Sequence, residues 1–120
     1  MTMVVHDIYE QLDPADQPYF WESRTKRLGR PIDQIQEGRE DRLPEVQARL
    51  EPLRRVVAAQ SFLGGESPVY ADYLAMAPFI WARRVSPFAL LDGDDPVHRW
   101  MHRCLDLFGG LLRQDTDYDW

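Results

Sequence analysis

Two histidines on one predicted helix are the side chains most suited to metal chemistry. His98 and His102 are four residues apart, which places both rings on one helix face, a spacing that can chelate zinc. A zinc site needs a third and usually a fourth ligand, and residues 99–101 are Arg, Trp and Met rather than the pattern of a zinc protease. We therefore interpret both histidines as solvated helix residues and expect no metal site.

Three other features have structural explanations that are simpler than chemical ones. Cys104 lies among apolar positions, where burial raises the pKa of a thiol and makes it inert. Asp92, Asp94 and Asp95 lack the glycine and the distant glutamate of a calcium loop, so capping of the following helix explains them better. Gly64-Gly65 lacks the Lys-Ser/Thr of a phosphate loop. No catalytic residue is predicted.

A cluster of aromatic residues over 70–85 suggests an apolar pocket. Trp81 is followed by Arg83-Arg84, which could hold an anion at the mouth of such a pocket. Aromatic residues at helical spacing also pack in a core, and arginines at the end of a helix complement its dipole. Packing in the core is the simpler explanation, and both remain open.

Length, charge and cysteine content limit the class of protein. With 120 residues, 44% of them hydrophobic, the chain can bury a core without disulfides, and its single cysteine excludes an internal one. The net charge of −6 disfavours binding to nucleic acid, which usually needs a basic surface. The longest apolar run, 73–82, is far shorter than the roughly 20 residues that span a membrane. We expect a cytoplasmic protein that binds neither nucleic acid nor a membrane.

Helices must position these side chains, since no segment alternates apolar and polar residues for long enough to form a strand. Asp13-Pro14 is typical of a helix start and Gly29 of a helix stop, which predicts a helix over 13–28. A longer helical segment follows over 33–60 and should be kinked or broken at its two prolines.

Two further helices are expected in the second half of the chain. The segment 70–85 is apolar on more than one side, which is typical of a buried helix, and Pro78 should kink it. The acidic loop should cap the last helix, whose apolar stripe extends to Leu112. The polar tail after Arg113 is expected to be mobile. The predicted fold class is all-α, a helical bundle around a central helix at about 70–85.

One run of residues resembles a known family more specifically than any single motif does. Phe62-Leu-Gly-Gly-Glu-Ser-Pro-Val-Tyr-Ala-Asp-Tyr73 is similar to the FLGG…P-x-Y-A-D-Y segment of the glutathione S-transferase C-terminal domain. The similarity covers nearly the whole chain, through Asp13–Gln17, Tyr19-Phe20, Ser23-Arg24, Arg27–Gly29, Gly38–Glu40, Leu53-Arg54, Trp81–Arg83, Asp94–Val97, Trp100 and Arg103–Phe108. The pattern resembles the bacterial and fungal etherase-like subgroup.

The resemblance implies that Asp72 is a structural cap. In the family, a Ser or Thr caps the central helix and an Asp three residues later bonds back to it, so that two backbone donors are satisfied reciprocally. Asp72 is present here, but Val69 stands at the Ser/Thr position and cannot accept a hydrogen bond. We expect half of this capping box to be missing, at a cost of about 1 kcal/mol.

The resemblance also implies which residues contact substrate. The all-α domain of these enzymes forms the wall that binds the electrophilic substrate, and by matching position Tyr19, Ser23, Arg24 and Trp81 are the predicted contacts. A solvated helix face explains Ser23 and Arg24 equally well. The residues that activate the glutathione thiol belong to a separate, thioredoxin-like N-terminal domain in this family.

The sequence begins at what resembles the linker between those two domains. We expect a linker-like segment at 1–12, the helical domain at 13–114 and an acidic tail at 115–120. The thiol-activating residues are then expected to lie outside this chain.

Three hypotheses for function follow. The first is a transferase-like domain that is inactive alone, binds no cofactor tightly and uses glutathione as cosubstrate only with a thioredoxin-fold partner. The domain face would be covered by that partner or by a homo-oligomer, because a contiguous exposed apolar patch is a liability. The second is a non-enzymatic protein-interaction module on the same fold. The third is a truncated frame of a two-domain transferase.

Overall fold

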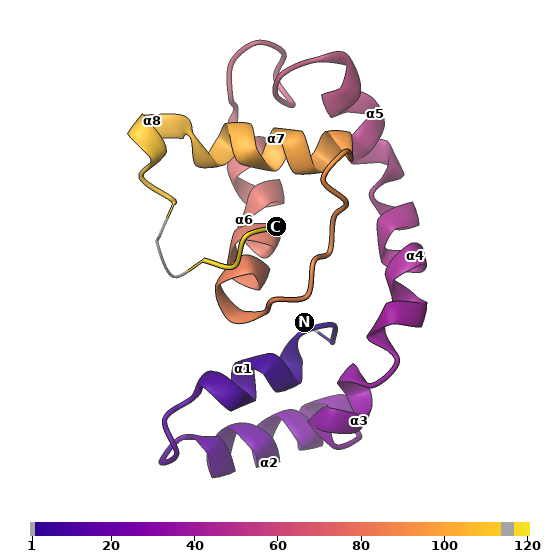
Figure 1. Ribbon diagram of the computed structural model, residues 1–120, viewed down its shortest axis with the longest axis vertical. Helices are drawn as coiled ribbons and strands as arrows, with labels where there is room; N and C mark the ends of the chain where they lie inside the picture. The colour runs from indigo at the N-terminus through magenta and orange to yellow at the C-terminus, as the bar shows by residue number, and fades with distance from the viewer. Residues whose placement is uncertain (1, 114–116) are drawn as a thin grey trace. The chain divides into compact units, whose positions relative to one another are not determined.

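All regular secondary structure in the described residues is helical. The computed structural model describes residues 2–113 and 117–120 (Figure 1). Within them lie α1 (Val5–Gln11), α2 (Gln17–Leu28), α3 (Ile32–Gln36), α4 (Arg39–Arg49), α5 (Glu51–Ala59), α6 (Tyr70–Val85), α7 (Pro96–Leu105) and α8 (Leu107–Gly110). These ranges hold no strand, only an isolated bridge between Phe62 and Gly65. The predicted all-α fold class is confirmed.

The chain divides into two compact units. Unit 1 comprises residues 1–42 and unit 2 comprises residues 43–120. The predicted domain end at residue 114 and the first two tail residues lie outside the described residues. None of the described helices has both the length and the apolar character needed to cross a membrane.

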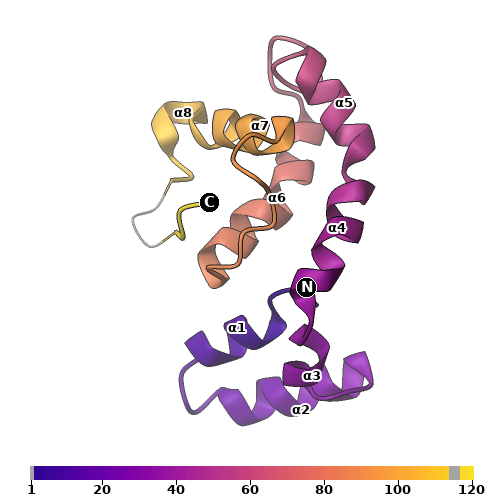
Figure 2. The ribbon, with the colours of Figure 1, turned by 45° about the vertical axis from the view of Figure 1, so that its right-hand side comes forward.

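Unit 1 is built on three short helices that contact one another, α1, α2 and α3 (Figures 1 and 2). Val5 of α1 packs with Ile32 and Ile35 of α3, and all three are buried. Aromatic side chains of α1 and α2 surround this small core, among them Tyr9 and Trp21, whose rings meet edge to face. The segment predicted to be linker-like therefore contains a helix with a buried face.

The start of α2 differs from the prediction. Asp13 does not cap a helix: its carboxylate accepts a hydrogen bond from the Ala15 N–H at 2.9 Å and closes a turn over 13–16. The helix begins at Gln17, with Pro18 among its first two residues. Both Pro14 and Pro18 are suited to the first turn of a helix. The hydrogen bond of the Asp13 side chain favours a turn at Pro14, so the helix starts near Pro18. The end is as predicted, since Gly29 has a left-handed backbone with φ of 80°.

The long segment predicted over 33–60 is three helices, α3, α4 and α5. The first break lies at Glu37 and Gly38, and Gly38 has a positive φ of 67°. The second lies at Leu50, and Pro52 then occupies one of the first two positions of α5, where its missing N–H costs nothing. Pro44 lies within α4. The breaks expected at the prolines are therefore confirmed at Pro52 only.

The core of unit 2 is centred on α7, which contacts α5, α6 and α8. Five of its apolar side chains are almost completely buried: Val97, Trp100, Met101, Cys104 and Leu105. The predicted cap is present, because the Asp95 carboxylate accepts the Val97 N–H at 2.8 Å. The buried face of α6 completes this core, with Met76, Phe79 and Ile80.

The end of α7 comes earlier than the apolar stripe predicts. The helix stops at Leu105, and α8 is irregular, since Phe108 and Gly109 have positive φ angles of 55° and 69°. This left-handed backbone redirects the chain, so Phe108 and Leu111 are 72% and 74% exposed instead of buried.

The two ends of α6 agree with the prediction, but its burial does not. One face carries exposed side chains, among them Tyr70, Leu74 and Trp81. The helix runs without interruption through Pro78, which is itself exposed. The carbonyl that loses its partner because Pro78 has no N–H belongs to Leu74, on the same exposed face, where water can satisfy it.

Candidate functional site

The three predicted contact residues of unit 1 lie on successive turns of α2. Tyr19 is 76% exposed, whereas Ser23 and Arg24 are half-buried. The Ser23 hydroxyl donates to the Phe20 carbonyl and accepts from the Arg24 guanidinium, both at 3.2 Å. The Arg24 guanidinium lies 4.8 Å from the centre of the Phe20 ring, a cation–π contact. Ser23 and Arg24 are thus bonded to each other and to Phe20. Side chains on a fully solvated helix face would not need these contacts.

Arg24 retains an unused donor in this arrangement. Its Nε is buried and has no hydrogen-bond partner among the described residues, and the same holds for the Thr25 hydroxyl next to it. A buried polar atom without a partner is uncommon and costs free energy. These two unpaired atoms are therefore a local cost in the packing of α2, and neither is exposed to a ligand at the surface.

The fourth predicted contact, Trp81, belongs to unit 2. Its side chain is 42% exposed on the outer face of α6, with Leu74 and Tyr70 further towards the start of that helix. An indole in this position offers an apolar surface. The prediction that these four residues contact substrate remains a prediction.

The Asp72 carboxylate in unit 2 accepts hydrogen bonds through both of its oxygens. Its Oδ1 accepts the Leu63 N–H at 2.9 Å and the Trp100 indole N–H at 2.8 Å. Its Oδ2 accepts the Val69 N–H at 2.9 Å, the half of the capping box that the sequence predicted. Valine offers no acceptor for the other half, and the Asp72 N–H bonds to the Val69 carbonyl instead. The carboxylate joins the 62–65 turn, α6 and α7.

Electrostatics support the charged form of Asp72. Its side chain is fully buried, and burial by itself raises the pKa of a carboxyl group. The hydrogen bonds from Leu63, Val69 and Trp100 outweigh burial and hold the pKa of Asp72 below its usual value. Asp72 is therefore structural: all its acceptor sites face the protein, and none is presented to a substrate.

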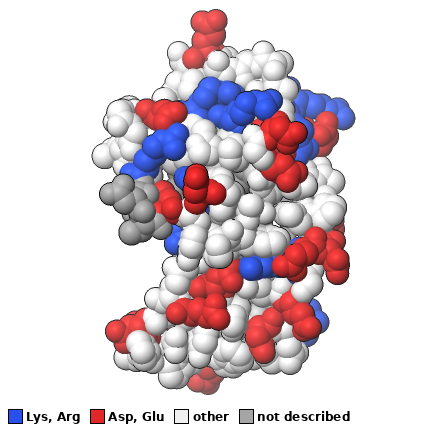
Figure 3. All heavy atoms as spheres, viewed as in Figure 1, with Lys and Arg blue, Asp and Glu red and all other residues white. Residues whose placement is uncertain are grey.

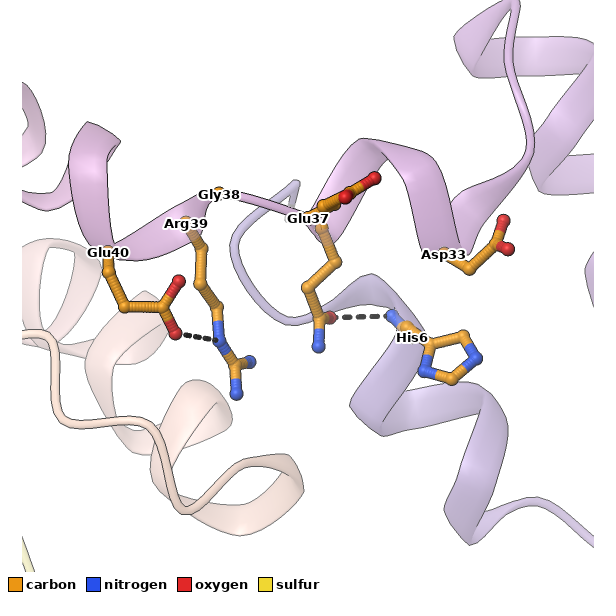
Figure 4. A pocket seen from close by; sticks show the side chains of 7 residues that line it. His6, Asp33, Glu37, Gly38, Arg39 and Glu40 are labelled. Carbon is orange, nitrogen blue, oxygen red and sulfur yellow. Dashed lines mark hydrogen bonds and ion pairs between the residues drawn. The ribbon is translucent and has the colours of Figure 1, made fainter.

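Unit 1 also has a hollow that the sequence did not predict (Figure 4). It has a volume of about 260 Å³ and is lined by His6, Asp33, Gln36, Glu37, Gly38, Arg39 and Glu40. On one side the His6 N–H donates to the Gln36 amide oxygen at 2.8 Å, and on the other Arg39 and Glu40 form an ion pair. The end of α3 and the start of α4 both contribute to this hollow, and Gly38, with its positive φ of 67°, lies between them.

Arg39, one of the charged side chains that line this hollow, belongs to a network of ion pairs and hydrogen bonds. Arg39 forms an ion pair with Asp7, whose other carboxylate oxygen accepts from the Gln36 amide. This network links α1 to the region between α3 and α4. Because Asp7, Gln36 and Arg39 bond to one another, this network is a structural part of unit 1.

The histidines and the cysteine of α7 do not form a reactive centre. The rings of His98 and His102 are stacked obliquely with centroids 4.4 Å apart. Burial, followed by the neighbouring His98 and Arg113, lowers the pKa of His102. In residues 2–113 and 117–120, no group of three His, Cys, Asp or Glu side chains is placed to hold a metal. Burial raises the pKa of Cys104 to about 12, which leaves the thiol protonated and unreactive, as predicted.

Arginines gather on the surface of unit 2 near α5 and α7 (Figure 3). A hollow of about 300 Å³ between these helices includes Arg99 and Arg103 in its lining. Arg103 donates to the carbonyls of Ser61 and Val57 near the end of α5, and Arg99 donates to the Asp94 carbonyl. Both arginines bond to backbone carbonyls, and Arg103 thereby joins α7 to the end of α5.

The all-α fold agrees with a comparison against protein families. Residues 1–107 match the family described as Glutathione S-transferase, C-terminal domain. Because the match spans most of the chain, the protein belongs to this family. The family predicted from the FLGG…PVYADY run is thus confirmed.

Proposed function

We propose that this chain forms the electrophile-binding wall of a glutathione transferase. The observation that carries the proposal is the family match over residues 1–107. Tyr19, Ser23, Arg24 and Trp81 are the proposed contacts, and the exposure of the Tyr19 and Trp81 side chains supports this choice. We assign the chain to the etherase-like subgroup and to the cytoplasm on its sequence pattern.

The chain alone is proposed to be inactive as a transferase. Conjugation needs a glutathione thiolate, and lowering the pKa of a thiol requires a donor or positive charge beside the sulfur. The family places these groups in a thioredoxin-like domain. Glutathione would accordingly act as cosubstrate only when such a domain, as a separate chain or an attached one, covers this chain.

A conjugation assay tests the proposal. The purified chain is mixed with reduced glutathione and a chromogenic aryl halide, with a complete two-domain family member as the positive control. We expect no turnover above the uncatalysed rate, and turnover after addition of a separately produced thioredoxin-like domain of this family. Turnover by the chain alone at the rate of the complete enzyme would disprove its inactivity.

Substitutions on α6 test the wall in the reconstituted enzyme. Trp81→Ala should raise the KM for the aryl halide several-fold, because it removes an apolar contact surface. Tyr70→Ala removes another exposed aromatic of the same helix and should leave KM unchanged. Equal effects of both variants would argue against a specific role for Trp81.

The second candidate is a non-enzymatic protein-interaction module. It is favoured by the exposed apolar side chains of α6, since such a face suits a protein partner or a homo-oligomer. Light scattering of the purified chain, together with the reconstituted assay, distinguishes the enzyme wall from the interaction module. A monomer at all concentrations, with reconstituted transferase activity, favours the enzyme wall, whereas a stable oligomer without that activity favours the module.

A further inference from the structure

Residues 117–120 lie against the end of α6 within unit 2 (Figures 1 and 2). Trp120 is only 9% exposed and belongs to the main core cluster of this unit. Its indole N–H donates to the Ser86 carbonyl at 3.1 Å, and Ser86 is fully buried. The expectation of a mobile tail is therefore wrong for these four residues, because a buried indole with a satisfied N–H anchors them.

An acidic side chain provides the second anchor. The Asp117 carboxylate is 4% exposed and lies beside two arginines, 3.3 Å from Nε of Arg84 and 3.9 Å from Arg83. The Arg83 side chain is itself only 6% exposed, and its Nε has no hydrogen-bond partner among the described residues. A buried guanidinium is costly unless an acid accompanies it, so this end of α6 is suited to an acidic group.

The backbone provides a third contact between these two anchors. The Tyr118 N–H donates to the Arg83 carbonyl at 2.9 Å, at the end of α6 where helix carbonyls lack helical partners. The side chains of Tyr118 and Asp119 are exposed. Recognition thus uses an acid, a backbone N–H and, three residues after the acid, an indole.

We propose that Arg83, Arg84 and Ser86 form a peptide-binding cradle for an extended segment with the pattern Asp-x-x-Trp. Residues 117–120 of this chain are its internal occupant. Arginine pairs that recognise an acidic motif and a pocket that takes one aromatic side chain are a recurring mode of peptide binding. The partner that fits is an acidic peptide with a tryptophan three residues after an aspartate.

The internal occupant regulates access to the cradle. A tethered segment competes with a free peptide at an effective concentration in the millimolar range. A free peptide must exceed that concentration to bind the intact chain. Any change that releases residues 117–120 exposes the cradle to a partner.

Peptide binding to the full-length chain tests this proposal. The probe is a fluorescein-labelled Asp-Tyr-Asp-Trp peptide, and the chain carries Asp117→Asn with Trp120→Ala to release the internal occupant. We expect this variant to bind the probe at least tenfold more tightly than the unmodified chain. The matched control, Asp119→Asn, changes an exposed acid of the same segment and should bind like the unmodified chain.

Three further changes, two in the probe and one in the chain, assign the binding to the cradle. Probes with Asn for the first Asp, or Ala for Trp, should lose at least tenfold in affinity, and so should the released chain when it also carries Arg84→Gln. Equal binding of all probes, or equal binding by the released and unmodified chains, would overturn the proposal.

A measurement on the unmodified chain keeps the proposal testable if the released variant does not fold. With 5-fluorotryptophan incorporated, the fluorine resonance of Trp120 is assigned from a Trp120→Phe chain. Millimolar unlabelled peptide should move this resonance to the position of an exposed indole. If the resonance does not respond to peptide, the peptide does not displace residues 117–120, which contradicts the proposal. If the resonance responds instead to dilution of the protein, Trp120 is buried in a dimer and is not an internal occupant.

Discussion

At the scale of single residues, Asp72 shows how one carboxylate can determine local structure. Three donors converge on it: the backbone N–H groups of Leu63 and Val69 and the indole N–H of Trp100. Asparagine in its place would present an amide NH₂ to at least one of these donors. A buried donor left without an acceptor costs about 1–3 kcal/mol.

We therefore predict that Asp72→Asn lowers the free energy of unfolding by about 2–3 kcal/mol at pH 7. Urea denaturation followed by circular dichroism measures it. Asp106→Asn is the matched control: the side chain of Asp106 is 64% exposed and pairs with Arg113, so its loss should cost less than about 1 kcal/mol. A similar loss in both variants would contradict the structural role of Asp72.

The same residue gives a prediction for pH. The folded-state pKa of Asp72 lies below the unfolded value of about 3.9, so its stabilisation is complete above that value and is lost as the pH falls through the folded-state pKa. The difference in unfolding free energy between the unmodified chain and Asp72→Asn should therefore shrink as the pH falls below about 4. A difference that stays constant down to pH 2 would show that the charge of Asp72 contributes nothing.

Val69 offers a stabilising substitution. It has the extended backbone of a helix N-cap, with φ of −121° and ψ of 171°, but no side-chain acceptor. Threonine has nearly the same shape and adds an oxygen that can accept the Asp72 N–H. Val69→Thr should raise the unfolding free energy by about 0.5–1 kcal/mol in urea, and the control Val69→Ala should not. A destabilised threonine variant would mean that the Val69 methyl groups matter more than the missing cap.

At the scale of helices, the sequence predicts features that depend on a few neighbouring residues. The ends of α6, the left-handed stop at Gly29 and the Asp95 cap all follow from local backbone chemistry. Three features do not follow from the helix signals in the sequence: the start of α2, the early end of α7 and the burial of Trp120. Each is determined by an interaction or a backbone conformation that those signals do not reveal. The Asp13 side chain closes a turn before α2, and Phe108 has a left-handed backbone after α7. Trp120 packs in the core beside Ser86, which is distant in sequence.

The candidate site divides in the same way. The resemblance selected four contact residues by position, but only the structure shows that Ser23 and Arg24 are bonded to each other. The hollow near His6 combines residues that are far apart in sequence, and so does the contact between the end of α6 and residues 117–120. Hydrophobic periodicity in a single sequence predicts helices, but it does not predict which distant residues come into contact.

Pairing between helices gives a prediction at this scale. Arg54 of α5 and Asp95, the cap of α7, form an ion pair at 2.8 Å, and the Asp95 side chain is only 8% exposed. Arg54→Ala leaves that carboxylate buried without its cation and should lower the unfolding free energy by about 3 kcal/mol. The adjacent Arg55→Ala is the control, since Arg55 is 78% exposed and should cost less than about 0.5 kcal/mol. Equal costs would contradict the role of the buried pair.

At the scale of the whole molecule, the division into two units implies unequal stability. The packed hydrophobic cluster of unit 1 consists of Val5, Ile32 and Ile35 with a few aromatic neighbours, whereas the cluster of unit 2 is several times larger. Smaller cores bury less surface and open at lower free energy. The proposed contacts Tyr19, Ser23 and Arg24 would then belong to the part that opens more readily.

Hydrogen exchange measured by NMR tests this inequality. We predict that the slowest amides of α1–α3 exchange with an opening free energy at least 1–2 kcal/mol below that of the slowest amides of α6 and α7. Ile32→Ala, which removes a fully buried side chain, should lower protection in α1–α3 by about 2–4 kcal/mol and leave α6 and α7 nearly unchanged. Met101→Ala, at a fully buried position of α7, is the reciprocal variant and should reduce protection in unit 2. If Ile32→Ala instead lowered protection equally in all helices, the two units would unfold as one cooperative structure, and the α2 face could not adjust to a ligand independently of unit 2.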